Sequence, residues 1–207
     1  MKIKKVIDLT HTISDFMPVH EYDETPRIEK IRNLEKDKYN DYRLSSGMHV
    51  GTHIDGPGHL TDSNILISQI PIDKFVGHGY LVDARNKKID KSLLKDLPDE
   101  ENLIVLILTG FDKKFGMQEY FSKHPVIEAD FAQELVNRKV KIIGIDFFSP
   151  DNFPFEVHKM FFENHILIAE NLTNLDKLIE VENFEIIALP VKIDADSGLA
   201  RVVAIVY

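Results

Sequence analysis

The hydrophobic positions of the chain fall into short runs with two different periods, which indicates alternating strands and helices. Residues 103–108 and 141–146 are apolar at nearly every position, which is typical of strands buried on both faces of a sheet. Between them, residues 128–139 place Phe131 and Leu135 on one face of a predicted helix, with acidic residues in its first turn. A strand, a helix and a second strand in this order predict a right-handed parallel crossover, and therefore an α/β fold.

Shorter patterns predict the other elements. We expect further strands at residues 5–9, 79–84, 165–170, 184–193 and 201–207. We expect short helices at residues 90–97, 156–164 and 175–180. Alternation over residues 42–48 predicts the second strand of a β-hairpin that leads to residue 49, whereas residues 27–34 fit neither period. Residues 14–26 show no periodicity and are predicted to form a loop that covers a pocket.

Composition narrows the class of protein. With 207 residues, of which 43% are hydrophobic and 29% charged, residues 1–207 are predicted to form a single globular domain. The chain has no cysteine, which excludes disulfides and thiolate metal sites. A formal charge of −9 argues against nucleic acid as a partner, because a protein binds nucleic acid mainly by neutralising its phosphates with lysine and arginine side chains. The longest apolar run is far below the roughly 18 residues of a membrane span, and no signal peptide is recognisable. We therefore expect a cytoplasmic protein that acts on a small molecule.

Candidate metal ligands are concentrated in the segment HVGTHIDGPGH, which begins at residue 49. Its three imidazoles and one carboxylate, from His49, His53, His59 and Asp55, are of the kinds that bind divalent metals. In a straight strand His49 and His53 would lie about 13 Å apart, so the chain has to bend at Gly51 or make one helical turn. His59 lies further along and approaches from another side, which suits a proton carrier better than a fourth ligand. The alternative interpretation is a histidine-rich turn that contacts only solvent.

Further candidates lie downstream. Glu170 ends an apolar strand, where it is either an exposed strand end or a metal ligand. His158 lies on a predicted helix, where a histidine can be exposed, buried with a structural role, or a ligand. Thr109 and Phe111 follow a buried strand, at the end where α/β sheets collect their ligands, and are candidate substrate contacts.

Other polar residues are weaker candidates. Asp146 ends a buried strand, and we favour a structural hydrogen-bonding role over a ligand role for it. The remaining histidines lack a neighbouring carboxylate or glycine and are expected to be structural or exposed: His11, His20, His78, His124 and His165. His11 and His20 flank the predicted covering loop, so either could contact substrate.

The histidine-rich segment resembles the HxGTHxDxPxH signature of the cyclase family of metal-dependent hydrolases, whose best-known members are the bacterial kynurenine formamidases. Every fixed position of the signature is present. The family's downstream pattern of IGID, a helical histidine and Glu-Asn-Leu is matched by residues 143–146, His158 and residues 170–172, so the resemblance covers nearly the whole chain. It implies an α/β layered domain of the swivelling β/β/α type with a mixed sheet. It also implies a homodimer or higher homo-oligomer.

The resemblance further implies a site for two divalent ions, zinc or manganese, with five ligands: His49, His53, Asp55, His158 and Glu170. The first three would hold one metal, Asp55 and Glu170 would bridge to the second, and His158 would complete the second site. His59 would take a proton from the attacking water and return one to the leaving nitrogen. The implied reaction is the hydrolysis of an amide, a formamide or a cyclic amide.

The chain departs from the formamidases in its predicted substrate contacts. Those enzymes carry a tryptophan in the loop after the first strand, and this chain has none. Phe16 could partly replace the indole, and Phe111 keeps an aromatic ring after Thr109-Gly110. The resemblance therefore implies the metal chemistry but not specificity for N-formylkynurenine. Two other functions stay open: a lyase or dehydratase that uses the metal as a Lewis acid, and a non-catalytic metal-binding protein.

Overall fold

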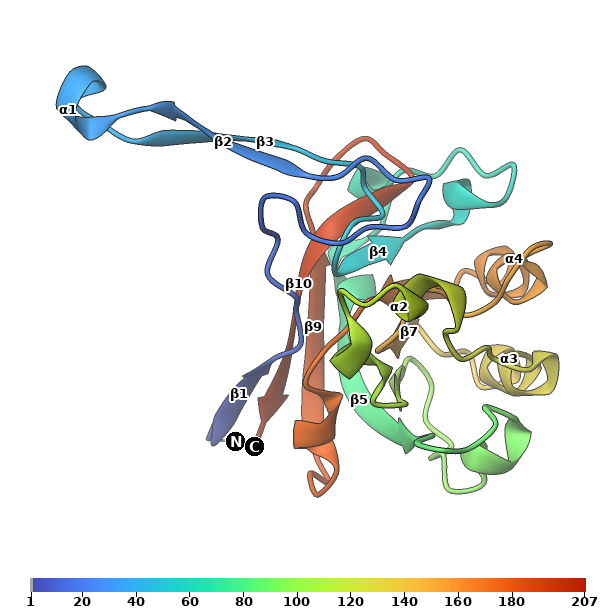
Figure 1. Ribbon diagram of the computed structural model, residues 1–207. Coiled ribbons are helices and arrows are strands. Elements are labelled where there is room, and N and C mark those ends of the chain that lie inside the picture. Colours follow the sequence, from blue (N-terminus) through green and yellow to red (C-terminus); the bar gives the residue numbers. More distant parts are fainter. Residues whose placement is uncertain (1) are drawn as a thin grey trace.

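The structure is a computed structural model that describes residues 2–207 (Figure 1). It contains these strands: β1 (Lys5–Asp8), β2 (Arg27–Arg32), β3 (Asp41–Ser45), β4 (His53–Asp55), β5 (Val76–Asp83), β6 (Ile104–Leu108), β7 (Ile142–Ile145), β8 (Leu167–Glu170), β9 (Phe184–Pro190) and β10 (Ser197–Val206). The main sheet has the order β1-β10-β4-β8-β7-β6-β5-β9. Because β9 also pairs with β10, seven of its strands close into a barrel-like ring, with β1 outside.

Parallel and antiparallel pairs are combined in this ring. Strands β5, β6, β7 and β8 are parallel neighbours, whereas β4, β9 and β10 pair antiparallel. The predicted mixed α/β sheet is thus confirmed, while the swivelling β/β/α topology stays a prediction.

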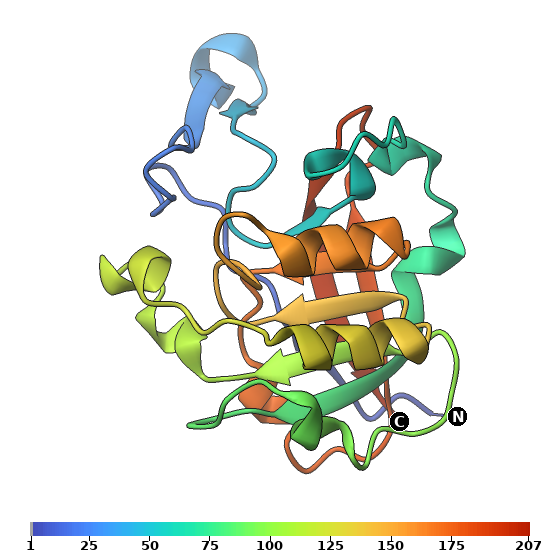
Figure 2. The ribbon, with the colours of Figure 1, turned by 90° about the vertical axis from the view of Figure 1, so that its right-hand side faces the viewer.

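Two helices, α3 (Ala129–Asn137) and α4 (Glu156–Glu163), lie side by side over the parallel strands (Figure 2). The other helical segments are short: α1 (Leu34–Asp37), α2 (Glu119–Ser122), η1 (Pro57–His59), η2 (Ile67–Gln69), η3 (Ile72–Phe75), η4 (Lys91–Leu94), η5 (Phe111–Lys114) and η6 (Leu175–Leu178). Across residues 2–207, none of these helices has the length and apolarity needed to cross a membrane.

The fully apolar sequence of β6 follows from its position between two hydrophobic cores. Val105 and Ile107 belong to the core under α3 and α4, whereas Ile104, Leu106 and Leu108 belong to the core inside the ring. Successive side chains of a strand point to opposite faces, so a strand with a core on each side is apolar throughout. The predicted strand, helix and parallel strand are confirmed as β6, α3 and β7.

Several elements differ from the sequence prediction. The helices expected at residues 90–97 and 175–180 are the short 3₁₀ turns η4 and η6. Strand β10 begins at Ser197 instead of residue 201, because its first three residues pair with β4 before the strand continues along β9. The predicted hairpin is confirmed as β2 and β3, but every residue of β3 is exposed and the hairpin projects from the ring (Figure 1).

Candidate metal centre

The floor of the site is built by the register of β4 and β8. His53 and Asp55 are two residues apart in β4 and share a face, while Ile54 points into the core of the ring. Opposite His53, in the antiparallel pair, lies Glu170 at the end of β8. Side chains of directly opposed residues meet on one face. His53 Nε2 accordingly lies 3.2 Å from Asp55 Oδ1 and 3.5 Å from Glu170 Oε2.

A bend at Gly51 brings His49 to the same point. Gly51 has φ +62°, and a Cβ on it would lie 3.0 Å from Met17 Cε, so both backbone and space favour glycine. Beyond this bend the rings of His49 and His53 have centroids 5.3 Å apart, and His49 Nδ1 lies 2.9 Å from Asp55 Oδ1. Of the two geometries that the sequence left open, the structure has the bend.

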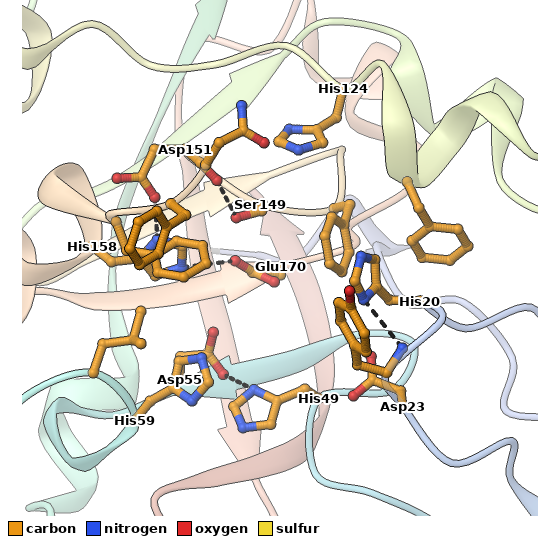
Figure 3. A pocket seen from close by; sticks show the side chains of 17 residues that line it. His20, Asp23, His49, Asp55, His59, His124, Ser149, Asp151, His158 and Glu170 are labelled. Atoms are coloured by element: carbon orange, nitrogen blue, oxygen red, sulfur yellow. Dashed lines mark hydrogen bonds and ion pairs between the residues drawn. The ribbon is translucent and has the colours of Figure 1, made fainter.

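Helix α4 supplies His158 from the opposite side of the site (Figure 3). Its Nε2 lies 3.4 Å from Glu170 Oε1, and its Nδ1 is hydrogen-bonded to Asp151. Asp151 also accepts a 2.7 Å hydrogen bond from the backbone N–H of Val157, which anchors the carboxylate at the start of the helix. Sequence reasoning missed Asp151, although an acidic residue in a Ser-Pro-Asp turn shortly before a histidine-bearing helix was a usable signal.

Hydrogen bonds fix which nitrogen of each ring faces the carboxylates. His53 Nδ1 lies 2.8 Å from the carbonyl oxygen of Gly51, which can only accept, so Nδ1 carries the hydrogen. When the ring is neutral, the lone pair of Nε2 then points toward Asp55 and Glu170. The Asp151 carboxylate orients His158 in the same way. Metal-binding histidines commonly have such a partner on the outer nitrogen.

Among residues 2–207, three buried polar atoms at this point find no hydrogen-bond partner: His53 Nε2, Asp55 Oδ1 and Glu170 Oε1. Buried polar atoms are nearly always paired, so three unpaired atoms that converge indicate a missing ligand. Two atoms bound to one tetrahedral ion at about 2.1 Å lie roughly 3.4 Å apart, close to the measured 3.2 and 3.5 Å. Nitrogen and carboxylate oxygen donors suit zinc and manganese alike. The residues fit a divalent cation.

The pKa values of the buried histidines in the cluster are shifted by the carboxylates beside them. Burial opposes charge on His53, but Asp55 and Glu170 outweigh it and raise the pKa of His53 to about 9. Burial also opposes charge on His158, and Asp151 with Glu170 raises its pKa to about 9. The pKa of Glu170 is itself raised by burial and by Asp55. Protons and metal ions therefore compete for the same nitrogens.

His59 ends η1 and lies beside His49, with ring centroids 4.0 Å apart. Its Nδ1 is 3.4 Å from Asp196 Oδ2, and burial lowers the pKa of the ring. Two sets of side chains, which share Asp55, could each hold a metal ion, because the potential ligand atoms within each set lie within 4.8 Å of one another. The two sets are His49, Asp55 and His59, and His53, Asp55 and Glu170. The sequence grouped the first ligands as His49, His53 and Asp55. The structure thus places His59 closer to the metal ligands than the sequence indicated.

A cavity of about 390 Å³ opens onto this cluster, and its floor is lined by His49, Asp55, His59, His158 and Glu170. Its upper wall is aromatic: His20, Tyr22, Phe121, Phe148, Phe153 and Phe155. His20 stacks on Phe148 with centroids 4.8 Å apart and planes 9° apart. Of the two histidines that flank the predicted loop, His20 lines this cavity, whereas His11 stacks on Phe115 outside it. His124, expected to be structural or exposed, also lines the cavity.

The three predicted substrate contacts are not among the residues that line this cavity. Phe16 is 65% exposed, with the Arg27 guanidinium carbon 4.0 Å from the centre of its ring. Thr109 donates its backbone N–H to Asp146, and Phe111 stacks on Tyr120 at 5.6 Å. The structure shows Asp146 in the hydrogen-bonding role favoured for it, with the backbone N–H groups of Thr109 and Gly110 as donors.

Solved structures with the same fold include isatin hydrolase A from Ralstonia solanacearum. It has a TM-score of 0.87 at 21% identity and covers 98% of this chain and 92% of its own. A second structure, described as a potential metal-dependent hydrolase with cyclase activity, has a TM-score of 0.81 at 25% identity and covers 98% of both chains.

Sequence comparison gives the family. A kynurenine formamidase from Bacillus cereus is 31% identical over 166 residues, which is 78% of this chain and 78% of that protein. Residues 7–152 match the model of the Cyclase family, whose description reads "Putative cyclase". That match includes the whole histidine-rich segment from His49 to His59. The chain therefore belongs to the cyclase family.

Proposed function

We propose that the protein is a metal-dependent hydrolase that cleaves the C–N bond of an amide, a formamide or a cyclic amide. The observation that carries this proposal is the convergence of unpaired, buried atoms from His53, Asp55 and Glu170 beside the imidazole of His59. Asp55, Glu170 and His59 also line a cavity large enough for a small molecule. The similarity to a Bacillus cereus kynurenine formamidase supports a formamide or a related amide as the substrate.

We assign the metal ligands as a two-ion site for zinc or manganese. His49, His53 and Asp55 would hold one ion, Asp55 and Glu170 would reach the second, and His158 would complete it. The short distances from Asp55 Oδ1 to both His49 Nδ1 and His53 Nε2 support a shared role for this carboxylate. Divalent ions bound here would lower the pKa of a water molecule and polarise the substrate carbonyl.

His59 is the proposed proton carrier. In the hydrolysis, the water oxygen adds to the carbonyl carbon while His59 accepts the water proton. The C–N bond then breaks, and His59 returns this proton to the leaving nitrogen, so one water is consumed and a carboxylic acid and an amine are formed. The position of His59 beside His49, with a ring nitrogen within 4.8 Å of an Asp55 carboxylate oxygen, supports this role.

The cavity wall supports a flat aromatic substrate without a carboxylate. The stacked pair His20 and Phe148 offers a planar surface, and an aromatic ring packs well on such a surface. Of residues 2–207, no lysine or arginine lines the cavity, whereas Asp23 does. A negatively charged substituent would therefore find no cationic side chain there. We expect neutral or cationic aryl amides to be preferred over anionic ones.

The test is a substrate screen with protein loaded separately with zinc and with manganese. Formanilides, lactams and imides are offered in water enriched in oxygen-18, and the acid product is analysed by mass spectrometry. Hydrolysis predicts one heavy oxygen in the new carboxyl group. A product formed without the heavy oxygen indicates a lyase or dehydratase, and absence of turnover with a fully metal-loaded protein indicates a binding function.

A homodimer or higher homo-oligomer is part of the proposal. The projecting β2-β3 hairpin exposes large apolar side chains: Leu34, Tyr39, Tyr42 and Leu44. Such exposed apolar groups commonly mark contact surfaces between proteins. Light scattering on the purified protein measures its mass, and a monomer of 23.8 kDa would contradict this part of the proposal.

A further inference from the structure

The link between β9 and β10 packs directly against the turn that carries His59. The backbone N–H of Gly56 donates to the carbonyl oxygen of Asp196 at 2.9 Å, and that of Ile67 donates to Ala195 at the same distance. A Cβ at Gly56 would lie 2.6 Å from the Asp196 carbonyl oxygen, and one at Gly58 would lie 3.4 Å from Asp196 Cβ. Gly56 and Gly58, which flank Pro57 at variable positions of the signature, therefore make room for this link, and the backbone of Asp196 is held in place.

The side chain of Asp196 faces two imidazoles of the site. Its Oδ2 lies 3.4 Å from His59 Nδ1 and 3.6 Å from His49 Nε2. His49 has a second neighbour on this side, since Ser197 Oγ lies 3.2 Å from the same Nε2. The Asp196 carboxylate is thus slightly closer to His59 than to His49, and it faces the Nδ1 nitrogen of the His59 ring.

A carboxylate beside Nδ1 decides what the other nitrogen can do. A carboxylate only accepts hydrogen bonds, so the hydrogen of a neutral ring stays on Nδ1 and the lone pair stays on Nε2. The distance of 3.4 Å is longer than an ideal hydrogen bond, but catalytic hydrogen bonds are often long in substrate-free enzymes and shorten during the reaction. When Nε2 accepts a proton, the same carboxylate stabilises the charged ring.

We propose that Asp196 is the positioning residue of His59, which it holds in the tautomer whose Nε2 exchanges protons with water and with the leaving nitrogen. This inference rests on the proposed function for its kinetic consequences. Its structural consequence, the tautomer of His59, does not depend on turnover. Failure of the proposed function and failure of this positioning role are therefore distinguishable.

The first test measures the tautomer in the full-length, zinc-loaded protein by nitrogen-15 NMR. Signals of His59 are assigned by their loss in His59→Ala. We expect the hydrogen on Nδ1 in the wild type and a shift toward Nε2–H in Asp196→Asn, because the amide can donate to Nδ1. Asp194→Asn is the matched control, since Asp194 lies in the same link but accepts from Ser68 Oγ. A wild-type ring with the hydrogen on Nε2, or an unchanged spectrum in Asp196→Asn, would overturn the proposal.

The second test separates positioning from a general loss of structure. Asp196→Asn is expected to lower kcat by about 10- to 100-fold, as for other residues that orient catalytic histidines. KM and metal content should stay near the wild-type values. In the His59→Ala background the same substitution should change kcat by less than about twofold, because its effect depends on the ring. An equal loss in both backgrounds, or a loss of metal, would assign Asp196 a different role.

Discussion

The floor and the wall of the cavity are built in opposite ways. The floor comes from β4, β8 and α4, and its Asp55, Glu170 and His158 are buried. The wall comes from loops and from the short helix α2, which carries Phe121, and two of its aromatic side chains are largely exposed, Tyr22 at 86% and Phe153 at 85%. Strand register fixes a ligand to within a fraction of an ångström, whereas loops accept substitutions at little cost in stability. The reaction is therefore expected to depend on the floor and the choice of substrate on the wall.

The largest effect is expected from a change in the floor. Replacing Glu170 with Gln removes a charge that the proposal assigns to the second ion, and we expect at least about a 1,000-fold loss of activity together with loss of bound metal. Metal content is measured by elemental analysis after dialysis. Glu163→Gln is the matched control, because Glu163 ends α4 in an exposed position. Full metal content in Glu170→Gln would remove this residue from the ligand set.

His59 stands at the border between floor and wall. His59→Ala is expected to lower kcat by about 100- to 10,000-fold, the usual contribution of a general acid–base group, while the metal content stays unchanged. Steady-state kinetics and elemental analysis on the same sample check both parts. Unchanged turnover would exclude His59 as the proton carrier, and lost metal would make it a ligand, which its grouping with His49 and Asp55 also allows.

The floor should bind metal more tightly as the pH rises. The pKa values of His53 and His158 are raised to about 9, so both rings are protonated at pH 7 in the metal-free protein and must release protons to bind an ion. Between pH 6 and pH 9 the apparent affinity should rise about tenfold per pH unit for each proton released. Calorimetric titration in buffers of different ionisation enthalpy counts these protons. An affinity that does not change with pH would contradict the proposed ligand roles of the two rings.

The smallest effect is expected from the wall. Phe148→Ala removes the surface on which His20 stacks, and we expect KM for an aryl amide to rise about 5- to 30-fold, with little change in kcat or metal content. Phe16→Ala is the control, since Phe16 lies outside the cavity lining. A comparable rise in Phe16→Ala would show that Phe16 contacts substrate after all.

The parts of the fold that the sequence predicted are those whose pattern has a local cause. The buried strands β6 and β7 and the helix α3 follow from the period of their apolar residues. The need to bring two imidazoles together predicted either a bend at Gly51 or one helical turn, and only the structure decided for the bend. The strand pairing of β10 was not predictable in this way. It divides its length between β4 and β9, and no period in its own sequence marks the change of partner.

The site likewise has a part that the sequence predicted and a part that it did not. The sequence by itself determined that four side chains of the kinds that bind metals, His49, His53, Asp55 and His59, lie within eleven residues of one another and are therefore candidate donors. Only the tertiary structure decided what surrounds these donors: Asp151 beside His158, Asp196 beside His59, and the aromatic wall in place of Phe16 and Phe111. These contacts join segments that are separate in the chain, and their geometry is set by strand register and loop packing, which leave no periodic trace in the sequence.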